Sequence, residues 1–418
     1  MNTPEDNSKT NPEWHESTRS VHAGEHRKRA HHAIVAPIVQ SSNFSFEDSA
    51  DVKEYMRRRE RGEGRGRSEY ARYGNPTVDA VEDRLAALEN AEEAVLFSSG
   101  MAAITSAIMT YVQQGDHVIM TDDCYRRTRE FMLNFLARFG VSVSMIPLND
   151  LEALKAALRP NTKIFFSETP TNPYLRVLNL PAWVAAAREA GALTMLDATF
   201  ATPINLKPLD WGVDVVLHSG TKYLGGHNDL LAGCAAGSHG LMKQLRETVF
   251  TMGPVLDPLP AFLLLRGIKT LGLRVQHQNQ ITQQVAEFLA AHPAIEEVWY
   301  PGLPNHPDHA IAKAQMRGFG GVISFTVKGD FDQTGAFIDH LKIPYLTPSL
   351  GAVESLITQP ALMSYTGYTA DQRRAMGVRD NLVRYSVGIE DARDLIDDLD
   401  QALHFLLGLK QNQGAANE

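Results

Sequence analysis

The chain has 418 residues, of which 44% are hydrophobic and 21% charged, a composition typical of a folded globular protein with a large core. Its formal net charge of -9 disfavours nucleic acid as the main partner, and no apolar segment is long enough to cross a membrane. The two cysteines form neither a CxxC pair nor a zinc-ligand spacing, so we expect no disulfide framework and no metal site.

Residues 1–66 are predicted to form an N-terminal arm, mostly irregular. The first twenty residues are polar and contain acidic groups, unlike a secretion signal or a transit peptide, which favours the cytoplasm. The run RRRERGEGRGR, Arg57–Arg67, holds six arginines. An RNA-contacting arm is one interpretation of this run. A flexible or subunit-facing segment is the alternative, and the absence of interleaved aromatic residues favours the latter.

From Thr77, which fits a helix N-cap, the pattern becomes regular, and short apolar strands alternate with helices. We predict strands at 94–97, 117–120, 141–147, 163–166, 192–196 and 213–217. We predict helices at 101–112, at 126–138, after the Asp150 cap and at 181–190. This alternation predicts an α/β fold with a mostly parallel central sheet covered on both faces, in a large domain over 67–258.

After about residue 258 the rhythm changes. A long helical stretch is expected at 260–292, followed by strands near 297–300, 322–325 and 382–387 and a final helix from 391 to about 407. The sequence therefore predicts a smaller α+β domain over 259–418.

The strand at 213–217 leads to Lys222, which lies among small and hydroxyl-bearing residues such as Ser219 and Thr221. A free lysine, with a reference pKa near ~10.4, is almost wholly protonated at neutral pH and is a poor nucleophile. Desolvation and a covalent imine both remove that handicap. Lys222 is therefore a candidate Schiff-base residue, most simply with pyridoxal phosphate. A phosphate-contacting or ion-paired lysine is the alternative.

Other polar groups are expected at the same edge of the sheet, because the carboxyl ends of parallel strands gather there. Ser99-Gly100 precedes a helix and offers N–H groups to an anion. Asp197 ends an apolar strand, where a protonated pyridine nitrogen would keep its carboxylate ionised. Tyr125 offers a ring for stacking. Each signal alone is common, but together with Lys222 they match what an aldehyde cofactor needs.

Several motifs then identify a resemblance that covers residues 18–408. The motifs are YARYGNPT (70–77), SSGMAA (98–103), ETPTNP (168–173), DATFATP (197–203), HSGTKYLGGH (218–227), PSLGAVESL (348–356) and RYSVGIED (384–391). The chain resembles the Cys/Met-metabolism group of pyridoxal-phosphate enzymes. Within this group, the runs TDDCYRRTR, TQPALMSY and HNDLLAGC are most similar to cystathionine γ-synthases of the plant type.

The resemblance implies an aminotransferase-like fold, the type I fold of pyridoxal-phosphate enzymes. Lys222 would form the Schiff base and then move the substrate's Cα and Cβ protons. Tyr125, the second catalytic residue, would stack on the cofactor ring, and Asp197 would pair with its nitrogen. The remaining cofactor-binding residues implied are Gly100, Met101, Ser219 and Thr221 at the phosphate, with Thr199 lining the site.

The resemblance also implies partners. Tyr70 and Arg72 match a pair that reaches the phosphate in a neighbouring subunit, so a homo-oligomer with shared sites is expected, as a dimer of dimers (a homotetramer). Arg384 matches the arginine that binds the substrate α-carboxylate, a bidentate contact suited to a guanidinium, with Asn172 and Ser349 assisting. Without the motif, an internal ion pair is the better interpretation of Arg384. The implied partners are small amino-acid substrates, with neither nucleic acid nor a membrane.

The chain departs from the family pattern at substrate-facing positions. Methionine γ-lyases carry a reactive cysteine where this chain has Arg127. Many bacterial synthases and the γ-lyases carry a glutamate where it has Pro348, and a glycine pair is altered to Gly351-Ala352. Arg127, with Arg126 and Arg129, would favour an anionic leaving group such as phosphate or succinate, although a solvated helix face explains the three arginines equally well.

These observations predict γ-replacement on an O-activated homoserine, with cysteine as nucleophile and cystathionine as product, as in transsulfuration and methionine biosynthesis. Alternatives within the family are γ-elimination by a cystathionine γ-lyase, sulfhydrylation by sulfide, or addition of another nucleophile. An alternative of a different class is a non-enzymatic RNA-binding protein, which would require Lys222 to bind no aldehyde.

Overall fold

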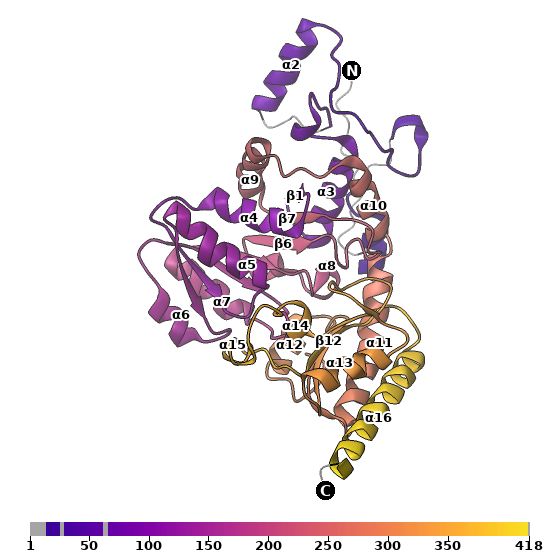
Figure 1. Cartoon of the computed structure of the whole chain (residues 1–418). Coiled ribbons are helices and arrows are strands. Elements are labelled where there is room, and N and C mark those ends of the chain that lie inside the picture. The colour runs from indigo at the N-terminus through magenta and orange to yellow at the C-terminus, as the bar shows by residue number, and fades with distance from the viewer. Residues whose placement is uncertain (1–13, 26–28, 62–65, 417–418) are drawn as a thin grey trace.

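The computed structural model describes residues 14–25, 29–61 and 66–416. Figure 1 shows a layered body from which the segment carrying α2 (Ser49–Glu60) projects at one end, while the long helix α16 (Ala392–Ala416) lies at the other. Helix α2 corrects the expectation of an irregular arm, because Asp48 caps a run of good helix formers by accepting from the N–H groups of Ala50 and Asp51. Within these ranges, no helix has the length and apolarity needed to cross a membrane.

The central sheet has seven strands in the order β1-β7-β6-β5-β4-β2-β3. Their bounds are β1 (Glu93–Phe97), β2 (His117–Thr121), β3 (Ser142–Ile146), β4 (Thr162–Glu168), β5 (Leu193–Asp197), β6 (Val215–Ser219) and β7 (Gly233–Gly237). The pairs from β3 to β6 are parallel, and β7 runs antiparallel to both its neighbours. The mostly parallel sheet is confirmed. Strand β7 was not predicted, because the segment GCAAG has no β-branched or aromatic residue.

Helices cover both faces of this sheet. Adjacent residues of β5 belong to different core clusters: Met195 packs with α4 (Gly100–Tyr111), and Leu196 packs with α7 (Leu180–Ala190). This arrangement explains why the strands are nearly continuous apolar runs. The other helices before residue 258 are α1 (Glu16–His22), α3 (Pro76–Glu89), α5 (Arg126–Glu130), α6 (Leu151–Ala157), α8 (Thr202–Asn205) and α9 (His239–Met252), with short helices at Ala30–His32, Ala71–Tyr73 and Pro208–Trp211.

Three helix expectations need correction. Asn75, not Thr77, caps α3, because its side chain accepts from the Thr77 N–H and Pro76 takes the first helical position. The helix expected at 126–138 is α5 followed by a π-helical turn at 131–135 and a 3-10 turn at 136–139. The helix expected at 260–292 is broken into α10 (Pro258–Ile268) and α11 (Leu271–Ala291).

A second sheet follows, with five strands in the order β10-β11-β12-β9-β8 and mostly antiparallel pairing. Its strands are β8 (Ile295–Trp299), β9 (Val322–Val327), β10 (Tyr345–Leu346), β11 (Leu356–Thr358) and β12 (Leu382–Ser386), accompanied by α12 (His309–Gln315), α13 (Phe331–His340), α14 (Pro360–Met363), α15 (Ala370–Ala375) and α16. This sheet has its own core cluster. We therefore propose a division into an arm (1–66), a large domain (67–258) and a C-terminal domain (259–418).

Candidate active site

The polar strand ends predicted from the sequence meet at the carboxyl edge of the central sheet. Strands β4, β5 and β6 are neighbours, and Glu168, Asp197 and Ser219 are their last residues. Glu168 pairs in register with Asp197, and Asp197 pairs with Leu217. The edge therefore places acidic and hydroxyl groups of different strands side by side, where ligands bind in open α/β sheets.

Lys222 lies in the turn that follows β6, and its backbone accepts from the Gly226 N–H at 2.7 Å. Its Nζ donates to Ser349 Oγ at 2.7 Å. Burial, together with the nearby positive charge of Arg384, lowers the pKa of Lys222 to about 8. A lysine with this pKa is a neutral nucleophile far more often than a solvated one, as Schiff-base chemistry requires.

Asp197 is buried, with 8% of its surface exposed, and its Oδ1 accepts two hydrogen bonds. Its Oδ1 accepts from the Thr199 N–H at 3.0 Å and from the Thr199 hydroxyl at 2.5 Å. Burial raises the pKa of Asp197, whereas the Thr199 bonds and His218 oppose that rise. No hydrogen bond from the described chain reaches Oδ2, so this oxygen is the one able to accept from a ring nitrogen.

The start of α4 forms a cradle against Ser219. Ser99 caps α4: its hydroxyl accepts from the Ala102 N–H, and its carbonyl accepts from the Ala103 N–H. Among the residues described, the N–H groups of Gly100 and Met101 have no acceptor, as expected at a helix N-terminus. A Cβ on Gly100 would lie 2.8 Å from the Ser219 Cβ, so glycine keeps this approach open. The cradle suits a phosphate.

Thr221 and Thr199 contact backbone around this cradle. The Thr221 hydroxyl accepts from the Ala232 N–H at 3.0 Å, and the Thr199 hydroxyl accepts from the Ser219 N–H at 2.8 Å. Thr199 therefore bridges the end of β5 to the end of β6. It positions both Asp197 and Ser219.

Arg384, on β12, joins three segments that are distant in sequence. Its Nη1 donates to Asn172 Oδ1 at 3.1 Å, and its Nη2 donates to the Ser349 carbonyl at 2.8 Å. Its Nε is buried and has no partner within the part of the chain described. Burial lowers the pKa of Arg384 to about 10. A guanidinium whose Nε is unpaired, next to Lys222, is suited to a substrate carboxylate.

Tyr125 follows β2 and is 43% exposed. Its N–H donates to Glu168 Oε2 at 2.8 Å, and its hydroxyl is close enough to Arg384 to influence that residue's pKa. Tyr125 is thus held at its backbone while its ring remains open on one side. The geometry is compatible with ring stacking.

Tyr70 and Arg72 are the two predicted residues whose contacts lie elsewhere. Tyr70 pairs with Asn43 through a β-bridge. The Arg72 guanidinium lies 4.7 Å from the Tyr73 ring centroid and donates to the Phe250 carbonyl of α9. Within the described part of the chain, neither side chain forms a hydrogen bond or ion pair with the strand-end cluster.

Sequence reasoning missed three participants. Glu168 lies between Tyr125 and Asp197. The sequence feature that could have identified it is an acidic residue at the end of an apolar strand, in the motif ETPTNP. His218 Nε2 lies 2.5 Å from Glu89 Oε1, and both side chains are buried behind Ser219. No sequence signal connects these two, because α3 and β6 are brought together only by folding.

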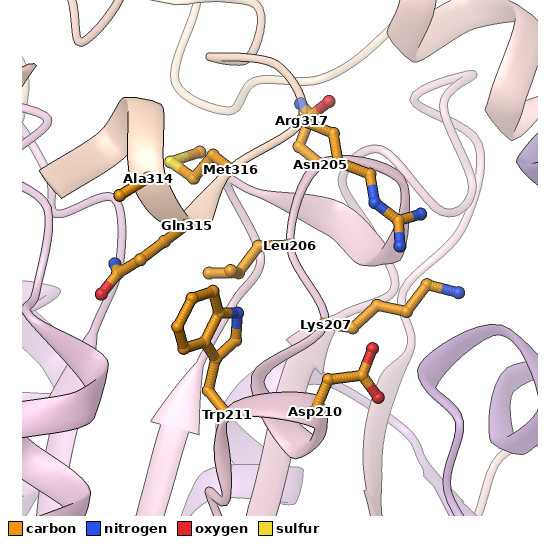
Figure 2. A pocket seen from close by; sticks show the side chains of 9 residues that line it. All are labelled: Asn205, Leu206, Lys207, Asp210, Trp211, Ala314, Gln315, Met316 and Arg317. Atoms are coloured by element: carbon orange, nitrogen blue, oxygen red, sulfur yellow. The ribbon is translucent and has the colours of Figure 1, made fainter. Parts of the chain in front are cut away.

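A hollow of about 400 Å³ lies away from these residues, between Pro208–Trp211 and α12. Figure 2 shows Lys207, Asp210 and Arg317 along one side of it and Gln315 and Met316 along the other. Lys207 and Arg317 are both ion-paired with Glu16. The hollow contains none of the predicted site residues, so it is separate from the candidate active site.

The strand-edge residues fit pyridoxal phosphate on structural grounds. The unused N–H groups of Gly100 and Met101 fit its phosphate, Oδ2 of Asp197 fits its nitrogen, the Tyr125 ring fits its face and Lys222 fits its aldehyde. When bound, the cofactor supplies an electron sink for carbanion chemistry.

Comparison with known proteins supports this fit. The family model for the Cys/Met metabolism PLP-dependent enzymes matches residues 17–404. A cystathionine gamma-synthase of Arabidopsis thaliana is 46% identical over 92% of this chain and 68% of its own length. A cystathionine gamma-lyase of Bacillus subtilis is 42% identical over 92% of this chain and 98% of its own.

The fold is also shared with solved structures. The cystathionine gamma synthase of Xanthomonas oryzae pv. oryzae, solved with aminoacrylate and cysteine, is 37% identical, with a TM-score of 0.88 over 94% of this chain and 99% of that one. The chain therefore belongs to the Cys/Met-metabolism family of pyridoxal-phosphate-dependent enzymes.

Proposed function

We propose that the protein catalyses γ-replacement on an O-activated homoserine, in which the sulfur of L-cysteine displaces the leaving group at Cγ and cystathionine is formed. The observation that carries the proposal is the chain of contacts from Lys222 Nζ to Ser349 Oγ and from the Ser349 carbonyl to Arg384. These contacts support a site in which a proton-transferring amine acts next to a carboxylate-binding guanidinium, as an α-amino acid substrate requires.

Each residue has a defined task in this proposal. Arg384 binds the substrate α-carboxylate, with Asn172 fixing its guanidinium. Lys222 would carry one proton at a time, first from Cα and then from Cβ, giving up the first before it takes the second, and would donate a proton again after the thiolate has added. Asp197 holds the ring nitrogen protonated. The pKa of about 8 for Lys222 keeps both its protonated and neutral forms accessible near neutral pH.

Replacement, rather than elimination, is supported by the residues near the stacking tyrosine. Arg127 occupies the position of the reactive cysteine of methionine γ-lyases, which counts against that elimination. Pro348 replaces a glutamate that many bacterial synthases and the γ-lyases share, so it does not separate the two activities. Arg126 and Arg127 are both ion-paired with Glu130, and the Arg127 side chain is 58% exposed. These guanidiniums support an anionic leaving group, provided that Glu130 releases one of them.

A cystathionine γ-lyase is the second candidate, because the Bacillus subtilis relative of that name is 42% identical. One product assay separates the two. The holoenzyme is given O-acetyl-, O-succinyl- or O-phosphohomoserine, with and without cysteine, and the products are identified. Cystathionine formed only with cysteine supports the synthase. No cystathionine from any ester, together with release of 2-oxobutanoate, cysteine and ammonia when cystathionine is supplied instead, contradicts it. Sulfide in place of cysteine tests the sulfhydrylase alternative.

We also propose a homo-oligomer whose active sites are shared. Ile34 on the arm is 85% exposed and Tyr70, just after the arm, is 39% exposed, so this part of the chain presents apolar surface that a second copy would cover. Mixing Tyr70→Ala subunits with Lys222→Ala subunits should restore part of the activity, because one site in the mixed dimer has both residues intact. No complementation would show that the sites are self-contained.

RNA binding by the arm has less support. Residues 62–65 of the arginine run lie outside the described residues. Among the others, Arg59 is ion-paired with Glu69, Arg67 with Asp51, and Arg57 with Glu54. These acids reduce the positive field that an RNA backbone would need.

A further inference from the structure

Glu168 is a buried carboxyl at the cofactor edge to which the proposed reaction gives no task. It is 4% exposed, ends β4 and accepts the Tyr125 N–H at 2.8 Å through Oε2. No cation donates to it within the described ranges. Among the described residues, the hydrogen-bond partner of its side chain is thus the backbone of Tyr125, whose ring we expect to face the cofactor.

A second carboxyl lies beside it. Glu168 and Asp197 are directly paired residues of adjacent parallel strands, and both are buried. When two carboxyl groups are buried as neighbours, the charge on one disfavours ionisation of the other. Asp197 has the Thr199 hydroxyl and N–H to stabilise its charge, whereas Glu168 has only one N–H. Asp197 is therefore the residue that keeps the charge.

The surrounding groups favour the same division of charge. Burial raises the pKa of Glu168 well above its ordinary value, and the negative charges of Asp197 and Asp123 raise it further. The Tyr125 N–H and the charge of Arg384, on β12, oppose this rise. Cys124, the other titratable neighbour, has its pKa raised by burial and stays a thiol.

We propose that Glu168 is a positioning residue of the cofactor site, whose protonated carboxyl fixes the backbone of Tyr125 while leaving Asp197 as the single anion at the ring nitrogen. The carbonyl oxygen of a neutral acid still accepts the Tyr125 N–H, although less strongly than a carboxylate oxygen would. A second negative charge beside Asp197 would compete for the ring proton, and a neutral Glu168 avoids this competition. The inference rests on the proposed stacking role of Tyr125.

The first test is cofactor affinity of the apoprotein, measured by absorbance titration with pyridoxal phosphate. Glu168→Gln keeps a carbonyl acceptor without a charge, so its dissociation constant should stay within about threefold of wild type, whereas Glu168→Met, which leaves the Tyr125 N–H unpaired, should weaken binding about tenfold. Ser167→Ala is the matched control. Ser167 lies next to Glu168 on β4, and the substitution removes its buried hydrogen bond to Thr121 of β2. Its affinity should match wild type.

Either of two results would overturn the proposal. Weak binding by Glu168→Gln, equal to that of Glu168→Met, would show that the negative charge is needed. Wild-type binding by Glu168→Met would show that the carboxyl positions nothing. Circular dichroism confirms that each variant is folded, and if Glu168→Met fails to fold, Glu168→Gln and the measurement below still decide.

The second test observes the proton directly in the apoprotein. The infrared difference spectrum, wild type minus Glu168→Gln, should show the carbonyl stretch of a protonated carboxyl near neutral pH. Carboxylate bands in its place would overturn the proposal. This readout does not involve Tyr125 or turnover. If Tyr125→Ala leaves cofactor affinity unchanged, the stacking role fails while the infrared result for Glu168 still stands.

Discussion

The carboxyl edge of the central sheet and the segment around Tyr70, which follows the N-terminal arm, both carry predicted cofactor-binding residues, but they differ in how those residues are supported. At the sheet edge, Lys222, Asp197 and Arg384 are enclosed and have partners from their own chain. Tyr70 in that segment is 39% exposed, and Ile34 on the arm is 85% exposed. One chain therefore assembles the chemistry of the amine, the ring nitrogen and the carboxylate, while the arm and Tyr70 present exposed surface that we propose another copy covers.

The largest effect is expected at the centre of the sheet edge. Lys222→Ala removes both the nucleophilic amine and the proton carrier, so kcat/KM should fall about a thousandfold or more, measured by cystathionine formation. The yellow absorbance of the cofactor adduct should be lost as well. Lys155→Ala, on an exposed lysine that pairs with Glu152, is the control and should keep both. An unchanged absorbance in Lys222→Ala would refute the assignment.

Arg384→Ala tests whether the edge recognises a carboxylate. Removing a half-enclosed guanidinium that holds both Asn172 and Ser349 should raise KM about a hundredfold, because the substrate carboxylate loses its charged partner. Arg384→Lys should not restore KM, since an ammonium cannot form the same fork of hydrogen bonds. Steady-state kinetics with each homoserine ester provides the measurement. An unaltered KM in both variants would place the carboxylate elsewhere.

Gly351→Ala tests the backbone that supports Ser349. Gly351 has φ +77°, and a Cβ there would lie 2.8 Å from the Tyr223 ring, so the substitution should destabilise folding by about 2 kcal/mol. Ala352→Gly is the control and should cost less than about 1 kcal/mol. Urea unfolding measures both. This comparison also explains why the altered glycine pair keeps its first glycine and tolerates alanine at the second position.

The pH dependence of stability isolates Lys222 without turnover. Its pKa is lowered from 10.5 to about 8 in the folded apoprotein, so the unfolded chain binds more protons between these values. Stability relative to Lys222→Met should therefore rise as pH increases from about 8 towards 10. Denaturant titrations of the two apoproteins at several pH values measure it. A difference that is flat or falls with pH would show that the amine is not desolvated.

The same two regions show what the sequence can reveal. Lys222 and Asp197 were identifiable because each is a chemically unusual residue at the end of a short apolar strand, which is local information. Arg384, Asn172 and Ser349 come from three distant segments, and only the family resemblance connected them. Without it, nothing in their spacing predicts that Arg384 would bond to both.

Fold predictions failed where tertiary contacts decide the outcome. The break between α10 and α11 follows Gly267, where a Cβ would lie 2.3 Å from the Gly225 carbonyl behind the Lys222 turn and where Arg274 donates to the Gly267 carbonyl. The helical periodicity of the sequence does not indicate this contact between distant segments, so it does not predict the break. Strand β7 was missed for a related reason, since its small residues are selected by close packing against Ser99 and Asp214 rather than by strand propensity.

The smallest effect is expected on the arm, in the association of subunits. It tests whether the arm, unlike the sheet edge, depends on a second copy. Ile34→Ala removes apolar surface that is 85% exposed in one chain, so if a second copy covers it, the dissociation constant of the oligomer should rise about fivefold. Leu151→Ala, on the exposed face of α6 and 44% exposed, is the matched control and should leave association unchanged. Sedimentation velocity at several concentrations measures both variants. Equal behaviour would mean that the arm's apolar residues are not the contact, and Tyr70 would then need another route to a neighbouring site.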